Sequence, residues 1–203
     1  DEDDPRNPSV NADNVGDNVG DVAGMGADLF DSNVAAMSAA LVMATALGKN
    51  NVVTVFVYAA IGLLASIIGV ATARIGKKGD PTKALNSSTY VTTGVFAVLT
   101  ALATALFNLE WAIWGASIIG LLVGTVIGLA TDYYTNDDKA PVRAVAKASE
   151  SGPAFTILSG FSYGLKSCLP ALIGIALSAL LSFVICDHFL GEGYGMFGIS
   201  MSA

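Results

Sequence analysis

The sequence predicts an all-α protein that crosses a membrane several times. Hydrophobic residues make up 53% of the 203 positions and charged residues only 13%, whereas a soluble domain of this length carries roughly a quarter charged residues. The apolar residues also gather in five runs, each close to or beyond the about 20 residues that cross a bilayer core. Composition and run length together indicate a polytopic membrane protein with five transmembrane helices and the beginning of a sixth.

The first apolar run, 22–47, is expected to belong to a longer helix. Asn7 and Pro8 resemble a helix start, with Asn as the cap and Pro at the first helical position. A helix from there to Leu47 would be about 60 Å long, against a hydrocarbon core of about 30 Å. Its N-terminal third should therefore project into the water beside the membrane.

Four further runs follow, at 51–75, 90–108, 112–132 and 153–186. Glycine and polar residues at 48–51 separate the first pair of helices, and 76–81 separates the second pair. Residues 108–110 predict a tight turn. The connection from 132 to 153 is longer and is expected to hold a short amphipathic helix.

Lysine and arginine predict which ends of the helices face the cytoplasm. Two connections carry most of the basic residues, namely Arg74, Lys77, Lys78 and Lys83 after the second run and Lys139, Arg143 and Lys147 after the fourth. Basic connections favour the cytoplasmic side. The N-terminal end then lies in the cytoplasm as well, and five spans place the C-terminal tail outside.

The acidic residues are concentrated at the N-terminal end. Of the 17 acids, nine lie in the first 31 positions: Asp1, Glu2, Asp3, Asp4, Asp13, Asp17, Asp21, Asp28 and Asp31. One base, Arg6, accompanies them. Acidity confined in this way indicates a site instead of a solubilising surface, and it argues against nucleic acid as a partner.

Three of these acids form a ladder within the repeat DNVGDNVGD, residues 13–21. Asp13, Asp17 and Asp21 share one face of an α-helix, with neighbouring Cβ atoms about 5–6 Å apart. Like charges so placed repel one another, and cations that bridge the carboxylates relieve the repulsion. Oxygen ligands without His or Cys favour Mg²⁺ or Ca²⁺, and Mg²⁺ held by a few carboxylates is the usual arrangement for phosphoryl chemistry.

The glycines of the same segment allow a different interpretation. Gly16, Gly20 and Gly24 follow an adjacent face and would let a second helix approach closely. The alternative to a cation or phosphate site is therefore a solvated acidic helix start, favoured by the helix dipole, beside a small-residue packing face.

The segment EDDPRNPSVNADNVGDNVGDVAGMGADLF resembles the ion-pumping membrane pyrophosphatases, and DNVGDNVGD is a highly specific motif of that family. GDPTKALNSSTY, DYYT and AKASESGPA also resemble family segments, in family order. The resemblance implies that the chain forms part of a bundle of sixteen helices in two concentric rings, and that the whole protein works as a homodimer in the lipid membrane. Residues 1–203 form one transmembrane domain in this interpretation. The resemblance places 1–47 in the inner, catalytic ring, 51–186 in the outer ring, and 194–203 at the start of the next inner helix.

The resemblance also implies residue roles. Glu2, Asp13 and Asp17 would help hold Mg²⁺–pyrophosphate at the cytoplasmic face, and Asp21 would activate the attacking water as the general base. Asp28 and Asp31 would form the ion gate, through which hydrolysis drives the pumping of Na⁺ or H⁺. K⁺ or Na⁺ would act as an activator. Other family motifs that complete the site are absent from this sequence, so the chain alone is expected to be inactive.

The position of the second gate acid suggests which ion is pumped. In this family an acid one turn after the gate aspartate is typical of sodium pumps, and one two turns after it is frequent in proton pumps. The one-turn position here is Asp31, and the two-turn position is Ala35, which carries no charge. The resemblance therefore favours sodium.

Two other functions stay open at this stage. The ladder would serve equally as the selectivity site of a divalent-cation channel or transporter that hydrolyses nothing, or the chain would be a scaffold with an acidic end. A transporter needs acids along its spans, and the second to fourth runs carry none between their ends.

Overall fold

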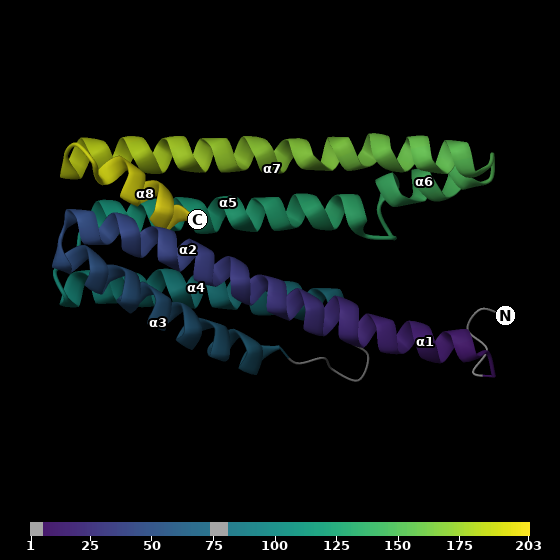
Figure 1. The fold of residues 1–203 in the computed structure, drawn as a ribbon, viewed down its shortest axis with the longest axis horizontal. Helices are drawn as coiled ribbons and strands as arrows, with labels where there is room; N and C mark the ends of the chain where they lie inside the picture. Colours follow the sequence, from purple (N-terminus) through teal and green to yellow (C-terminus); the bar gives the residue numbers. More distant parts are fainter. Residues whose placement is uncertain (1–5, 74–80) are drawn as a thin grey trace.

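The computed structural model describes residues 6–73 and 81–203, and in that part of the chain it contains helices and no strands. The fold class predicted from the sequence is confirmed. Five helices are long and apolar enough to cross a membrane. They run side by side along the long axis of the molecule, and α1 and α6 lie at the same end (Figure 1).

The N-terminal helix is continuous from Pro8 to Leu47. It consists of α1 (Pro8–Gly16), a π-helical segment η1 (Asp17–Gly24) and α2 (Met25–Leu47). Its predicted start is confirmed, because Asn7 is the N-cap and its Oδ1 accepts a hydrogen bond from the Ser9 N–H at 3.1 Å. The helix ends at Gly48, whose φ of 124° suits glycine and few other residues.

The next three helices are α3 (Lys49–Thr72), α4 (Pro81–Leu106) and α5 (Trp111–Thr135). The break predicted at 48–51 is confined to Gly48, because 49–51 already form the first turn of α3. The turn predicted at 108–110 is confirmed, and Asn108 has a φ of 51°. Most of the break predicted at 76–81 lies outside the described residues, and only position 81 is described. Arg74, Lys77 and Lys78 also lie outside the described residues. α4 begins nine residues before the apolar run at 90. Hydropathy did not predict this start, because polar turns of helix give no hydropathy signal.

The long fourth connection contains the predicted amphipathic helix, α6 (Ala140–Ser149). Pro141 on it is buried, whereas Arg143 and Lys147 are exposed. α7 (Pro153–Leu190) follows as a single 38-residue helix. The chain then reverses through Gly191 and Gly193, both at positive φ, into α8 (Tyr194–Ser202), which lies beside α7 and α5 (Figure 1).

A cluster of small and large apolar side chains joins four of the helices. The core cluster consists of Ala40, Ala44, Val55, Ile113 and Phe197, contributed by α2, α3, α5 and α8. α8 approaches its neighbours so closely that a Cβ on Gly198 would lie 2.5 Å from the Cys186 Sγ. Close backbone approach at glycines is typical of helices packed in a membrane, where lipid offers no hydrophobic drive for association.

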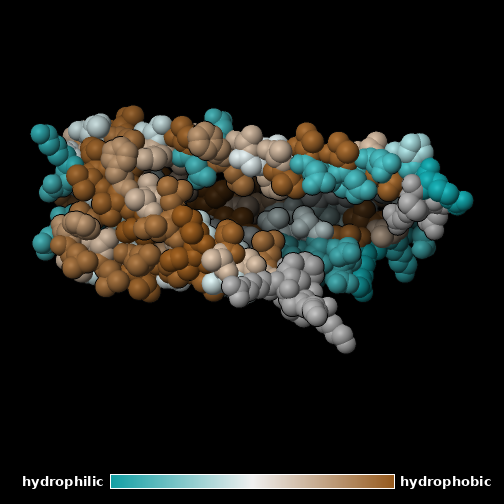
Figure 2. All heavy atoms as spheres, turned by 90° about the horizontal axis from the view of Figure 1, so that it is seen from below, coloured by the Kyte–Doolittle hydropathy of each residue, from teal (hydrophilic) through white to brown (hydrophobic). Residues whose placement is uncertain are grey.

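Much of the exterior is apolar. Large hydrophobic side chains such as Leu63, Ile157 and Phe189 are 70%, 73% and 72% exposed. Figure 2 shows hydrophobic residues over most of one face and hydrophilic residues gathered toward the end that holds α1 and α6. An apolar exterior over five long helices is what a lipid environment requires. The hydrophilic end fits the predicted projection of the first helix beyond the hydrocarbon.

Candidate functional site

The aspartate ladder lies at the hydrophilic end of the bundle. Asp13 belongs to α1, and Asp17 and Asp21 belong to η1. All three side chains are exposed. Glu2, the fourth acid assigned to this site from the sequence, lies outside the described residues.

The backbone of the ladder differs from the regular α-helix that the sequence suggested. Residues 17–24 form a π-helix, closed by i→i+5 hydrogen bonds instead of i→i+4 bonds. Four residues of α-helix overshoot a full turn by about 40°. Four residues of π-helix fall short of a turn, because each π turn holds more residues. The step from Asp13 to Asp17 and the step from Asp17 to Asp21 therefore deviate in opposite directions.

A side-chain hydrogen bond lies at the start of η1. The amide of Asn18 donates to the Asn14 carbonyl at 2.8 Å, and the Asp17 N–H donates to both the Asn14 and the Asp13 carbonyls. Asn33 donates to the Leu29 carbonyl in the same way, at 2.9 Å, within the regular α-helix α2, so this contact alone does not produce a π-helix. Sequence reasoning missed the π-helix, because the residue spacing carries no specific signal for it.

The two predicted gate acids lie just beyond the π-helix. Asp28 is in the first turn of α2, and Asp31 follows one turn later. Both side chains are exposed in this chain. Because the helix is continuous, one element carries the ladder outside the apolar region and the gate acids at its entrance.

The ladder alone does not enclose a metal ion. Among the described residues, no group of three or more His, Cys, Asp or Glu side chains lies close enough to hold one. The donors are nevertheless carboxylates without imidazole or thiol, which fits Mg²⁺, an ion that keeps several waters and shares phosphate oxygens with its substrate. The described part of the chain thus supplies carboxylate oxygens of the kind that Mg²⁺ prefers but forms no metal site by itself.

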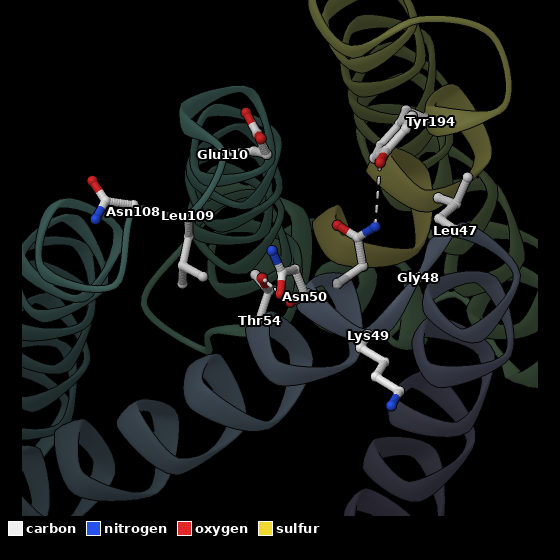
Figure 3. Close-up of a pocket in the computed structure, with 10 residues that line it drawn as sticks. Leu47, Gly48, Lys49, Asn50, Thr54, Asn108, Leu109, Glu110 and Tyr194 are labelled. Carbon is white, nitrogen blue, oxygen red and sulfur yellow. Dashed lines mark hydrogen bonds between the residues drawn. The ribbon is translucent and has the colours of Figure 1, made fainter.

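A polar pocket lies at the opposite end of the bundle (Figure 3). Its cavity of about 290 Å³ is lined by Leu47, Gly48, Lys49, Asn50, Asn51, Thr54, Asn108, Leu109, Glu110 and Tyr194. The buried Asn51 donates to the Tyr194 hydroxyl at 3.4 Å, the dashed line in Figure 3, and so ties the start of α3 to α8. Glu110 is the single carboxylate in the lining, so this pocket lacks the paired acids of the ladder.

Other polar residues of the spans serve packing. Lys166, a charged residue of α7, places its Nζ 5.1 Å from the centroid of the Tyr163 ring, a cation–π contact within its own helix. Cys168 and Cys186 are both free thiols. None of these three residues belongs to the ladder or lines the pocket.

The comparisons with known proteins agree with this arrangement. A family model described as inorganic H+ pyrophosphatase matches residues 1–203. The chain is 43% identical over 207 residues to a candidate K⁺-stimulated pyrophosphate-energized sodium pump of Clostridium tetani, covering 100% of this chain and 30% of that protein. It is 37% identical over 211 residues to K⁺-insensitive pyrophosphate-energized proton pump 2 of Moorella thermoacetica, covering 99% and 31%.

A third relative is a K⁺-stimulated pyrophosphate-energized sodium pump of Thermotoga maritima, 32% identical over 236 residues that cover 100% of this chain and 31% of that protein. The chain thus spans about 30% of the length of these relatives. Sodium pumps and proton pumps both occur among them. The match over every residue of the sequence shows that the chain belongs to the inorganic H+ pyrophosphatase family.

Proposed function

We propose that this chain is part of an ion pump that hydrolyses Mg-pyrophosphate at the cytoplasmic face and moves Na⁺ or H⁺ across the membrane. The observation that carries the proposal is one continuous helix, Pro8–Leu47, with three aspartates at its hydrophilic end and two more at the entrance to its apolar part. The names of the relatives, all pyrophosphate-energized pumps, support hydrolysis over a divalent-cation channel.

The ladder residues divide the chemistry between them. Asp13 and Asp17, with Glu2, hold Mg²⁺–pyrophosphate through carboxylate oxygens. Bound Mg²⁺ neutralises charge on the phosphoryl oxygens. Asp21 accepts a proton from the water that attacks phosphorus in line with the leaving phosphate, the role of a positioned general base. Other helices of the whole protein complete this site.

Asp28 and Asp31 form the gate for the pumped ion. Carboxylates at the entrance of an apolar helix are costly unless they bind a cation or a proton, which makes them the natural coupling residues. Asp31 supplies a second carboxylate one turn from the first, and this favours Na⁺. K⁺ or Na⁺ serves as an activator, in line with relatives named for their response to K⁺.

The surrounding assembly follows the same proposal. The helix Pro8–Leu47 belongs to the inner ring of the bundle, α3 to α7 form part of the outer ring, and α8 begins the next inner helix. The full protein is a homodimer in the lipid bilayer, with the ladder on the cytoplasmic side.

Single replacement of the ladder aspartates in the full-length protein tests the hydrolytic role. Asp13→Asn, Asp17→Asn and Asp21→Asn should each lower pyrophosphate hydrolysis by about 100-fold or more, the scale expected for a general base. Asp137→Asn is the matched control, since Asp137 is an exposed acid in the connection before α6. Hydrolysis near the wild-type rate in all three ladder variants would remove the ladder from the active site.

A further inference from the structure

The π-helical segment η1 contains Asp17 and Asp21 of the ladder. We infer that η1 sets the angular register of Asp21 against Asp13, so that Gly20 and Gly24 are positioning residues for the reaction. The inference rests on the proposed function. It starts from the finding that an otherwise α-helical, 40-residue helix changes its hydrogen-bond pattern at Asp17–Gly24 and nowhere else in the described part of the chain.

The change of hydrogen-bond pattern alters where Asp21 lies around the helix axis. In an unbroken α-helix, Asp21 would be rotated by about 80° from Asp13 around the helix axis. Because the step through η1 falls short of a turn, it cancels much of the overshoot made between Asp13 and Asp17. Asp21 is thereby returned to the face of Asp13, where the base and the metal-holding carboxylate can meet one substrate.

The glycines of η1 allow the backbone to be tested without a steric clash. A Cβ on Gly20 would meet nothing within 4 Å, and one on Gly24 would lie 3.6 Å from the Val19 carbonyl oxygen, an ordinary contact. Alanine at both positions therefore fits sterically, and it changes the segment through its stronger preference for α-helix.

Deletion of Val22 in the full-length protein is the central test. The deletion removes the extra residue of η1, so the segment becomes α-helical while both flanking parts of the helix keep their places. Asp21 alone is then turned away from Asp13. We expect a folded protein whose KM and Mg²⁺ dependence stay within about threefold of wild type, whereas kcat falls by about 100-fold, as for a misplaced base.

Deletion of Val34 is the matched control, because Val34 lies in the α-helical part of α2. That deletion must rotate the rest of the helix against its neighbours and is expected to abolish folded protein. Gly20→Ala with Gly24→Ala should lower kcat in the same sense as the Val22 deletion. Gly26→Ala, a glycine of α2 with nothing within 4 Å of its added Cβ, should leave kcat unchanged.

Electron cryomicroscopy of the full-length protein gives a readout independent of activity. It should show i→i+5 bonds across 17–24 in the wild type and i→i+4 bonds after deletion of Val22. Regular α-helix in the wild type, a Val22 deletion that unfolds like the Val34 deletion, or one with unchanged kcat would each overturn the inference. The proposed function fails separately, if wild type does not hydrolyse pyrophosphate or Asp21→Asn is fully active.

Discussion

The hydroxyl of Tyr58 on α3 lies 2.7 Å from the Thr104 Oγ1 on α4, and both side chains are buried. The Thr104 hydroxyl already donates to the Thr100 carbonyl at 2.8 Å, so Tyr58 is the donor in this pair. The Tyr58 ring also meets Phe96 edge-on, with centroids 6.4 Å apart. One aromatic residue thus joins two neighbouring spans through a hydrogen bond and a ring contact.

We predict that Tyr58→Phe and Thr104→Val each lower the free energy of unfolding in detergent by about 0.6 kcal/mol, with an upper limit of about 1.7 kcal/mol. The magnitude is modest because polar groups of the unfolded chain also find partners in the membrane. A double-mutant cycle, measured by denaturant titration, should show that the two effects overlap. Simple addition of the two effects would mean that the hydrogen bond contributes nothing.

Gly198→Ala is predicted to disturb the packing of α8 on α7. The new Cβ would lie 2.5 Å from the Cys186 Sγ and 2.6 Å from the Ser182 carbonyl oxygen, closer than real contacts allow. The backbone at Ser182 cannot move without disturbing α7, so we expect the free energy of unfolding to fall by about 1–3 kcal/mol. Thermal unfolding of the full-length protein in detergent measures this loss.

Gly128→Ala on α5 is the control for that substitution, since a Cβ there would meet nothing within 4 Å. It should leave the unfolding temperature unchanged or raise it slightly, because alanine favours helix over glycine. If both substitutions changed the unfolding temperature equally, a steric clash at position 198 could not be the cause.

Asp31→Ala is predicted to weaken the binding of the pumped ion. In vesicles containing the full-length protein, wild type should take up radioactive sodium during pyrophosphate hydrolysis without acidifying the interior. The alanine variant should lose about tenfold in sodium affinity, equivalent to about 1.4 kcal/mol of binding free energy. Ser32→Ala, the exposed neighbour, is the control. Proton uptake without sodium uptake in wild type would reverse the ion assignment.

The Cys186 thiol is predicted to resist alkylation in the folded protein. It is fully buried, and its Sγ lies 3.6 Å from the Ala112 carbonyl oxygen on α5. Reaction with a small maleimide, followed by mass spectrometry of the peptides, should detect modification of Cys186 only after denaturation in sodium dodecyl sulfate. Rapid labelling of the native protein at Cys186 would mean that α5 and α7 separate there.

Much of the fold could be predicted because its signals are local. The Asn7 cap, the break at Gly48 and the turn at Asn108 each follow from the chemistry of one or two residues, and all were confirmed. The start of α4 at Pro81 was missed, since turns of helix outside an apolar run carry no hydropathy pattern.

The candidate site was predictable in composition but not in geometry. The spacing of Asp13, Asp17 and Asp21 identified the ladder, whereas the i→i+5 hydrogen bonding of η1 leaves no mark in the spacing of residue types. The pocket beside Asn51 and Tyr194 was missed for another reason, because it joins segments 143 positions apart.

The contacts of α8 also determine the order in which this part of the protein can assemble during synthesis. Domains and helices fold from the N-terminus as the ribosome extends the chain. α2 packs on α3, the next helix in the sequence, yet its core residues Ala40 and Ala44 lie in a cluster that also includes Phe197 of α8. The α2–α3 pair therefore reaches its final packing only after α8 has been synthesised, and until then the surface that α8 covers stays open to other contacts.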